Sequence, residues 1–336
     1  MKTIRTGRAP ILRIVFGVLL SSFLAATGGH AADADWKPSE TIEIVVSQGP
    51  GGATDLLARL MQRILRDEGL LQVPVNVVNR PGAGGRIGLD YLAKRPADGH
   101  TLSIANTTLL STHIVGRSPL TYTNFTPVAT LAQEHVAFAV HPTSPFNTGK
   151  DLLDRLKQDP TAPSIAIGAA VGNQNHIAIA LVAKAVGVDP RKLKTVIFKS
   201  GGETMTQILG GHVDLGMTSA GQFVKHVEAG RVRLLAIAAP QRLEGDLSGI
   251  PTWREQGVDS VAGLWFAVIA PANVPAAAVR FWDRAVAAVV RNEEWRQFMR
   301  SRQMLPMHHG SDGAAKFLKA EYDMLKNTLG ELGLAK

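Results

Sequence analysis

The loop at residues 47–55 has the composition best suited to binding an anion. It reads Ser-Gln-Gly-Pro-Gly-Gly-Ala-Thr-Asp and joins an apolar, strand-like run directly to an amphipathic helical segment. Glycines let the backbone turn its N–H groups towards a ligand, and a helix N-terminus adds unpaired donors and a partial positive charge. The loop therefore predicts that the N–H groups of Gly51, Gly52 and Ala53 hold a carboxylate, with the Thr54 hydroxyl nearby. Tight-turn geometry alone is an equal explanation for these glycines.

Motifs that would assemble a catalytic or metal site are missing from the sequence. The loop lacks the Gly-Lys-Ser/Thr ending of a P-loop, and residues 82–88 place their last glycine one position late for a dinucleotide fingerprint. The ten histidines form no HExxH helix, and the adjacent His308 and His309 cannot both face one tetrahedral metal from a regular helix. No G-x-S-x-G elbow occurs. We therefore expect a binding protein without catalytic residues, metal or cofactor.

The first 31 residues have the pattern of an export signal. Four basic side chains precede an apolar run at residues 14–26, and small residues at positions 29 and 31 suit cleavage by a signal peptidase. The apolar run is short and weakly flanked for a membrane anchor. We expect cleavage after about Ala31, which would place the mature protein in the periplasm.

Charge indicates which partners the protein can bind, and the cysteine content and length indicate how it is stabilised. The chain has 36 basic and 28 acidic residues, and removing the four basic residues of the export segment leaves 32 minus 28, or +4. This small basic excess is spread along the chain, so it favours anions weakly and does not indicate nucleic-acid binding. No cysteine is present, so stability must come from packing. A mature chain of about 305 residues is long enough for two modest cores.

Apolar strand-like segments alternate with helical patterns, which is typical of parallel α/β units. We expect a helix that begins at a Thr54 cap and ends at Gly69. The expected strands fall into two groups, at residues 42–46, 75–78 and 101–105 and at residues 164–167, 195–198 and 214–217. Polar or glycine-rich turns follow most of them, and ligands of open α/β sheets bind at the carboxyl ends of strands.

Two further extended segments, residues 136–140 and 262–271, would cross between these groups and form a hinge. The sequence therefore predicts two α/β lobes with a cleft between them. We expect residues 1–31 to form the signal peptide, 32–140 the first part of lobe 1, 141–261 lobe 2, and 262–336 the return to lobe 1 with the C-terminal helices.

Five motifs, in order and spacing, resemble a known family: GPGGATD, NRPGAGG, ADGHTL, LGGHVDLGMTSA and WFAVIAPANVP. The chain resembles the Bug-type substrate-binding receptors of tripartite tricarboxylate transporters over about residues 36–334. The resemblance implies an α/β, type II-like, two-lobe periplasmic binding protein of the Venus flytrap kind. Such a receptor binds a small organic acid through backbone amides, hydroxyls and ordered water. The resemblance also implies delivery of the acid to membrane permease subunits. We expect the receptor to be a monomer, because it must dock on the permease.

The resemblance places the ligand-binding residues in both lobes. In lobe 1 they are Ser47, Gln48, Gly51, Gly52, Ala53, Thr54, Asn106 and Thr107. In lobe 2 the family's contact regions fall on residues 172–176, 199–202 and 218–219, and the expected ligand-binding residues are Gly172, Asn173, Asn175, Thr218 and Ser219. The sequence departs from the family pattern at Gln48, where an aromatic residue is usual. Without an aromatic side chain to stack on an aromatic ligand, the site is expected to favour a small polar or aliphatic acid over an aromatic acid.

Several alternatives stay open. Asp55 is better explained as a first-turn residue that complements the helix dipole than as a ligand contact, and His176 as a residue that orients its loop. A receptor of the same fold could present its ligand to a sensor kinase, and an exported α/β hydrolase could act on organic acids. The acid itself could be a dicarboxylate, a tricarboxylate, an amino acid or an aromatic acid.

Overall fold

The computed structural model describes residues 1–3, 36–168, 172–198 and 201–336. The predicted export signal therefore lies almost entirely outside the described residues, as does Lys199. The chain forms two units, Met1–Trp36 and Lys37–Lys336, and every described helix and strand belongs to the second. None of the described helices is both long and apolar enough to span a bilayer.

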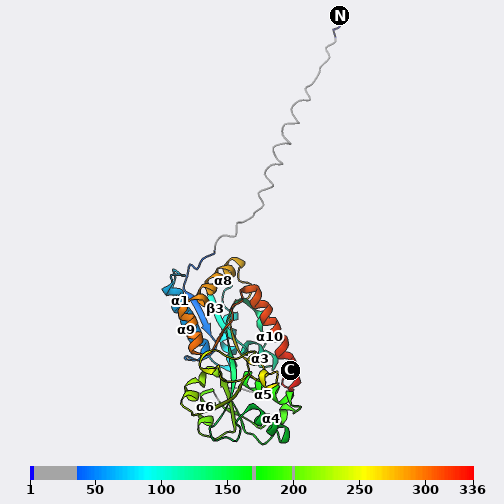
Figure 1. The fold of residues 1–336 in the computed structure, drawn as a ribbon. Helices are drawn as coiled ribbons and strands as arrows, with labels where there is room; N and C mark the ends of the chain where they lie inside the picture. Colours follow the sequence, from blue (N-terminus) through cyan, green and yellow to red (C-terminus); the bar gives the residue numbers. More distant parts are fainter. Residues whose placement is uncertain (4–35, 169–171, 199–200) are drawn as a thin grey trace. The chain divides into compact units, whose positions relative to one another are not determined.

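One mixed, ten-stranded sheet runs through the second unit (Figure 1). The strand order is β2-β1-β3-β9-β4-β7-β5-β6, and β8 and β10 pair with β4 outside this path. The strands are β1 (Ile42–Val46), β2 (Val75–Asn79), β3 (Thr101–Asn106), β4 (Phe125–Val140), β5 (Ile165–Gly168), β6 (Thr195–Phe198), β7 (Leu215–Ser219), β8 (Arg233–Ile237), β9 (Gly263–Pro271) and β10 (Leu305–Pro306).

Helices surround this sheet (Figure 1). The α-helices are α1 (Ala53–Asp67), α2 (Arg86–Ala93), α3 (Thr108–Ile114), α4 (Gly149–Gln158), α5 (Gln174–Ala185), α6 (Gly201–Leu209), α7 (Val224–Glu228), α8 (Ala276–Arg291), α9 (Glu293–Ser301) and α10 (Ser311–Glu331). Short 3-10 helices are η1 (Ala83–Gly85), η2 (Tyr122–Asn124), η3 (Pro190–Lys192), η4 (Ala220–Gln222), η5 (Gly245–Leu247) and η6 (Arg254–Gln256).

The long strand β4 joins the two halves of the sheet. Residues 125–135 pair antiparallel with β9, whereas residues from Val136 onwards pair with β7 and β8. The chain crosses back at Ala262, whose N–H donates to the Ala238 carbonyl and whose carbonyl accepts from the Val136 N–H. Two extended segments thus connect the halves, as the two-lobe prediction requires. The residues at which the lobes divide stay a prediction.

Each half contains the parallel βα units that the alternating pattern predicts. In one half β1 lies between β2 and β3, and in the other β5 lies between β6 and β7, all in parallel. The β1 side chains Ile42, Ile44, Val45 and Val46 have no exposed surface, because β1 is an inner strand of the sheet and helices α1 and α2 pack against it. Four of the five tryptophans are also fully buried. The strands that position the predicted binding turns are therefore closely packed.

Three local predictions differ from the structure. Thr54 does not cap α1, because Gly52 occupies the N-cap position and the Thr54 hydroxyl accepts a hydrogen bond from the Asn106 amide at 3.3 Å. Strand β4 begins at Phe125 instead of residue 136, because residues 125–135 pair antiparallel with β9. Strands β8 and β10 were not predicted.

Candidate functional site

A cavity of about 740 Å³ lies where the turns of the two sheet halves meet. All of the sequence-predicted binding residues except Gly51 and Thr107 line it: Ser47, Gln48, Gly52, Ala53, Thr54, Asn106, Gly172, Asn173, Asn175, Thr218 and Ser219. Residues from both halves therefore face one space, which is the arrangement that the two-lobe hypothesis needs. Their contact with a ligand stays a prediction.

Asp55 shapes the first loop from behind the cavity. Its side chain is only 2% exposed, and Oδ2 accepts hydrogen bonds from the Gly51 N–H at 2.9 Å and from Arg59 Nε at 3.0 Å. Oδ1 accepts from Asn79 Nδ2 at 2.9 Å, and the same Asn79 amide donates to the Gln48 carbonyl at 3.1 Å. Burial by itself would raise the pKa of Asp55, but the hydrogen bonds from these three residues outweigh it and leave the pKa lowered. Asp55 is thus an anionic clamp on the loop and not a mere complement to the helix dipole.

The clamp decides which backbone donors face the cavity. The Gly51 N–H is engaged by Asp55, and a φ of +80° at Gly51 turns the chain so that this bond can form. The N–H groups of Gly52 and Ala53 donate to no partner within the described part of the chain. Both residues line the cavity at the N-terminus of α1, where the helix dipole favours an anion. Of the three predicted donors, Gly52 and Ala53 are therefore placed for a carboxylate.

The second predicted contact of this half is a hydrogen-bonded corner. Asn106 donates to Thr54 and accepts from both the N–H and the hydroxyl of Thr108, at 3.0 and 2.7 Å. The Thr107 hydroxyl is buried and accepts from the Trp265 N–H at 3.4 Å. Asn106 thus joins the C-terminal end of β3 to the first turn of α1 at the cavity. Thr107 does not line the cavity and instead contacts the crossing strand β9.

The opposite wall is built by the turn before α5 and by the end of β7. Asn173 caps α5 and also donates to the Gly168 carbonyl, while the Gly172 N–H donates to His176 Nδ1 at 3.0 Å. His176 therefore orients its loop, as expected, and burial lowers the pKa of its imidazole. Asn175 is 3% exposed, and its Oδ1 accepts no hydrogen bond from the described residues. This turn presents amide groups to the cavity and no charge.

Sequence reasoning missed Glu134, which also lines the cavity. Glu134 lies on β4 at the crossing between the sheet halves and accepts a hydrogen bond from the Ser219 hydroxyl. Burial raises the pKa of this carboxyl, more than the Ser219 hydrogen bond and the Arg302 charge lower it. An acidic residue within a mostly apolar strand was the signal in the sequence. The loop at residues 81–85, from the motif NRPGAGG, is a second addition to the wall.

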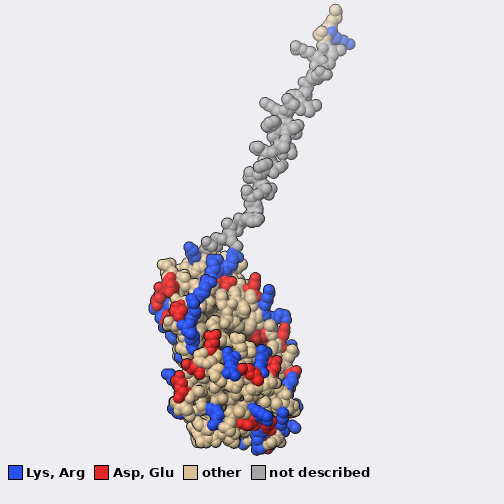
Figure 2. All heavy atoms as spheres, viewed as in Figure 1, with Lys and Arg blue, Asp and Glu red and all other residues tan. Residues whose placement is uncertain are grey.

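The ionisable groups around the cavity are few. Among the described residues that line it, only Arg117 and Glu134 have ionisable side chains. Within the described parts of the chain, no group of three or more His, Asp or Glu residues could hold a metal ion. Basic and acidic side chains are interspersed over the molecular face in Figure 2, without a large region of one sign. The cavity therefore suits a ligand recognised mainly by hydrogen bonds.

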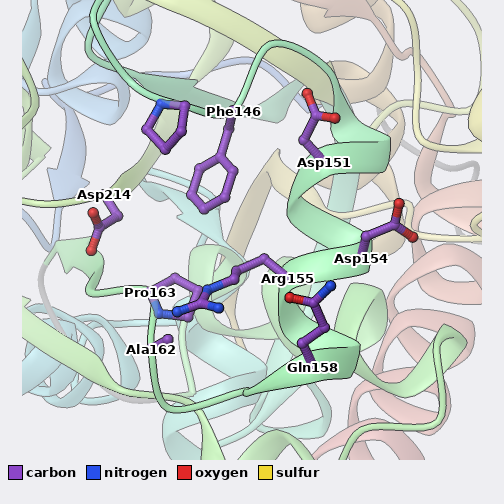
Figure 3. A pocket seen from close by; sticks show the side chains of 9 residues that line it. Phe146, Asp151, Asp154, Arg155, Gln158, Ala162, Pro163 and Asp214 are labelled. Carbon is purple, nitrogen blue, oxygen red and sulfur yellow. The ribbon is translucent and has the colours of Figure 1, made fainter.

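A second cavity, of about 530 Å³, lies beside α4 and is shown in Figure 3. Three aspartates and one arginine line it, namely Asp151, Asp154, Asp214 and Arg155. Asp214 is held by the N–H and hydroxyl of Ser164. An excess of carboxylates repels an organic acid, so this cavity is a poorer candidate than the one between the sheet halves.

The sequence is similar to a known family of transport receptors. The family described as "Tripartite tricarboxylate transporter family receptor" matches residues 57–334. Protein BugT of Bordetella pertussis is 28% identical over 315 residues, covering 92% of this chain and 94% of BugT. A UPF0065 protein from the tcbD-tcbE intergenic region of Pseudomonas sp. strain P51 is 32% identical over 271 residues, covering 80% of this chain and 78% of that protein.

Solved structures agree with the fold. The R. palustris protein Rpa4515 with adipate has a TM-score of 0.77 and 27% identity, covering 90% of this chain and 99% of that chain. A TctC solute binding protein from Polaromonas has a TM-score of 0.74 and 25% identity, covering 88% and 99%. The predicted α/β two-lobe binding-protein fold is confirmed by these similarities.

Proposed function

This chain belongs to the tripartite tricarboxylate transporter receptor family, and from that premise we propose that it binds a small organic carboxylate in the periplasm and delivers it to the membrane permease subunits of a tripartite transporter. The family and the similar structures are binding proteins. We further propose that the chain catalyses no reaction and acts as a monomer. Export requires that the segment at residues 1–31 is a cleaved signal peptide.

One observation carries the proposal. The N–H groups of Gly52 and Ala53, at the N-terminus of α1, line a cavity whose opposite wall is formed by Asn173, Asn175 and Thr218. Charge-assisted hydrogen bonds of a carboxylate to such donors contribute on the order of 1.5 to 3 kcal/mol each. Adipate in Rpa4515 is a carboxylate in a protein of the same family fold, and supports this class of ligand.

The division of the wall suggests how a ligand is retained. Residues 47–54 and Asn106 would form one jaw, and residues 172–175 with Thr218 and Ser219 the other, in lobes bounded as predicted at about residues 140 and 262. Because the jaws belong to different halves of the sheet, a ligand bound to both favours the closed arrangement. The hinge would be the part of β4 from Val136 onwards and the segment that enters β9 at about Ala262.

The test is isothermal titration of the mature protein and of Gly52→Val with a panel of two- to six-carbon mono-, di- and tricarboxylates, amino acids and benzoate. Gly52 has an extended backbone, with φ −75° and ψ 166°, and the nearest neighbour of an added Cβ is the Gly49 carbonyl oxygen at 3.7 Å. A Cβ at position 52 is therefore in ordinary van der Waals contact and leaves the turn unstrained. A valine side chain there should instead crowd the donors and weaken acid binding at least tenfold at an unchanged Tm.

Gly249→Val is the matched control, because an added Cβ at Gly249 meets nothing within 4 Å. This control should bind as the unsubstituted protein does. Recovery of the bound acid unaltered, by mass spectrometry, would support a receptor over the hydrolase alternative. Wild-type affinity in Gly52→Val would show that the carboxylate site is wrongly assigned, and conversion of the acid would refute the receptor function. Tighter binding of benzoate than of aliphatic acids would contradict the inference from Gln48.

A further inference from the structure

The side chains around the cavity are rich in hydrogen-bond acceptors that lack donors. Glu134 is 8% exposed, and one hydroxyl, that of Ser219, donates to its carboxylate among the described residues. A carboxylate has about four lone-pair positions that can accept hydrogen bonds. The buried oxygens Oε1 of Gln48 and Oδ1 of Asn175 accept no hydrogen bond from the described residues. Buried acceptors without donors are costly, so each favours a donor from a bound molecule.

The position of Glu134 is rigid. Glu134 pairs with Leu264 across β4 and β9, and an added Cβ at Gly263 would lie 1.9 Å from the Glu134 carbonyl oxygen. The backbones of β4 and β9 are therefore in close contact at Glu134, and the strand pairing holds this segment in place. Ser219, which holds the carboxylate, is itself fixed opposite Val136 in the β4–β7 pairing. Glu134 cannot be displaced readily to make room for a second anion.

Glu134 also lies close to the proposed carboxylate position. A smaller cavity of about 280 Å³ is lined by Gly52, Ala53, Glu134 and Ser219, and the same four residues line the main cavity. Arg302 lines the smaller cavity as well and attracts the Glu134 carboxyl from a distance. A ligand whose carboxylate binds at Gly52 and Ala53 would therefore bring its neighbouring carbon atoms towards Glu134.

We propose that Glu134 is a specificity residue, which selects acids that carry a hydrogen-bond donor, hydroxyl or ammonium, near the carboxylate and rejects a second carboxylate at that position. This inference rests on the proposed function, because it assumes that the α1 N-terminus holds the first carboxylate. Gln48 and Asn175 extend the same selection by offering two further acceptors. The alternative, in which Glu134 is only a structural partner of Ser219, predicts no effect of its charge on ligand choice.

The test uses butanoate and three acids that differ from it only by a substituent on C2: 2-hydroxybutanoate, 2-aminobutanoate and 2-ethylpropanedioate, in which a second carboxylate replaces the hydroxyl or ammonium. Titration at pH 7.5 should show that wild type binds the hydroxy or the amino acid at least tenfold more tightly than butanoate or 2-ethylpropanedioate. Glu134→Gln keeps an acceptor for Ser219 but removes the charge, so 2-ethylpropanedioate should gain at least fivefold. If the selected donor is an ammonium, Glu134→Gln should also weaken the amino acid at least tenfold. If it is a hydroxyl, Glu134→Leu, which has no acceptor, should produce that loss for the hydroxy acid.

Glu321→Gln is the matched control, because burial also raises the pKa of Glu321 on α10, which is not among the residues that line either cavity. It should leave all four affinities unchanged. Equal affinities of wild type and both Glu134 variants for every acid, within twofold, would overturn this inference and leave the receptor function intact. Failure of the folded wild type to bind any carboxylate, in this set or the wider panel, would overturn both.

Discussion

Replacing Asp55 by asparagine tests whether this residue holds the binding loop in shape. The buried carboxylate accepts hydrogen bonds from Gly51, Arg59 and Asn79, at 2.9, 3.0 and 2.9 Å. An amide retains one acceptor oxygen and turns an NH2 group towards at least one of these donors. Hydrogen bonds to charged groups contribute about 1.5 to 3 kcal/mol each, and a buried donor left unpaired adds to the loss. Arg59 is half exposed, so its ion pair adds little.

We therefore expect Asp55→Asn to lower the free energy of unfolding by about 2 to 4 kcal/mol. It should also weaken acid binding at least tenfold, because the Gly52 and Ala53 donors lose their preorganisation. The lowered pKa of Asp55 means that its contribution is fully present above the pKa of an unfolded aspartate, about 3.9, and is lost as the pH falls through the lower folded value. The stability of wild type should converge on that of the variant in this acidic range.

Urea denaturation, fitted with one m-value for wild type and variants, measures the change in stability. Isothermal titration with the acid measures the change in affinity. Asp67→Asn is the matched control, since Asp67 lies on the same helix but pairs with Arg66 where both side chains are exposed. This control should leave the urea midpoint unchanged, because an ion pair between exposed side chains contributes little. The reasoning fails if Asp55→Asn unfolds at the urea concentration of wild type and binds the acid within twofold of it.

Two further outcomes follow from the contacts between the sheet halves. Gly221→Ala should destabilise the protein by about 1 to 3 kcal/mol in urea, because an added Cβ would lie 2.0 Å from the Arg302 carbonyl oxygen, which is backbone and cannot swing aside; Gly249→Ala is its control, and equal midpoints for the two variants would contradict this. Saturation with an acid identified by titration should reduce the radius of gyration in small-angle scattering, because the ligand contacts both jaws. An unchanged radius of gyration, in a protein whose ligand-free form is open, would count against closure.

The predictions that held from sequence alone rest on interactions between near neighbours. The alternation of strands and helices, the termination of α1 at Gly69 with a φ of +62°, and the glycine-rich turn before α1 all follow from local backbone preferences. The family resemblance added the functional class, because five motifs in register constrain the whole chain. Neither source depends on knowing which distant side chains touch.

The roles of single side chains in the cavity were decided by contacts between distant residues. Two of the hydrogen bonds to Asp55 come from residues four positions away, but the third, from Asn79, forms because β1 and β2 pair. Thr54 was lost as a cap because the end of β3 places Asn106 within hydrogen-bonding distance of its hydroxyl. Glu134 and Ser219 are 85 residues apart and meet only through the pairing of β4 with β7. Residue type and local spacing carry no information on such register, which strand pairing and packing set over the whole fold.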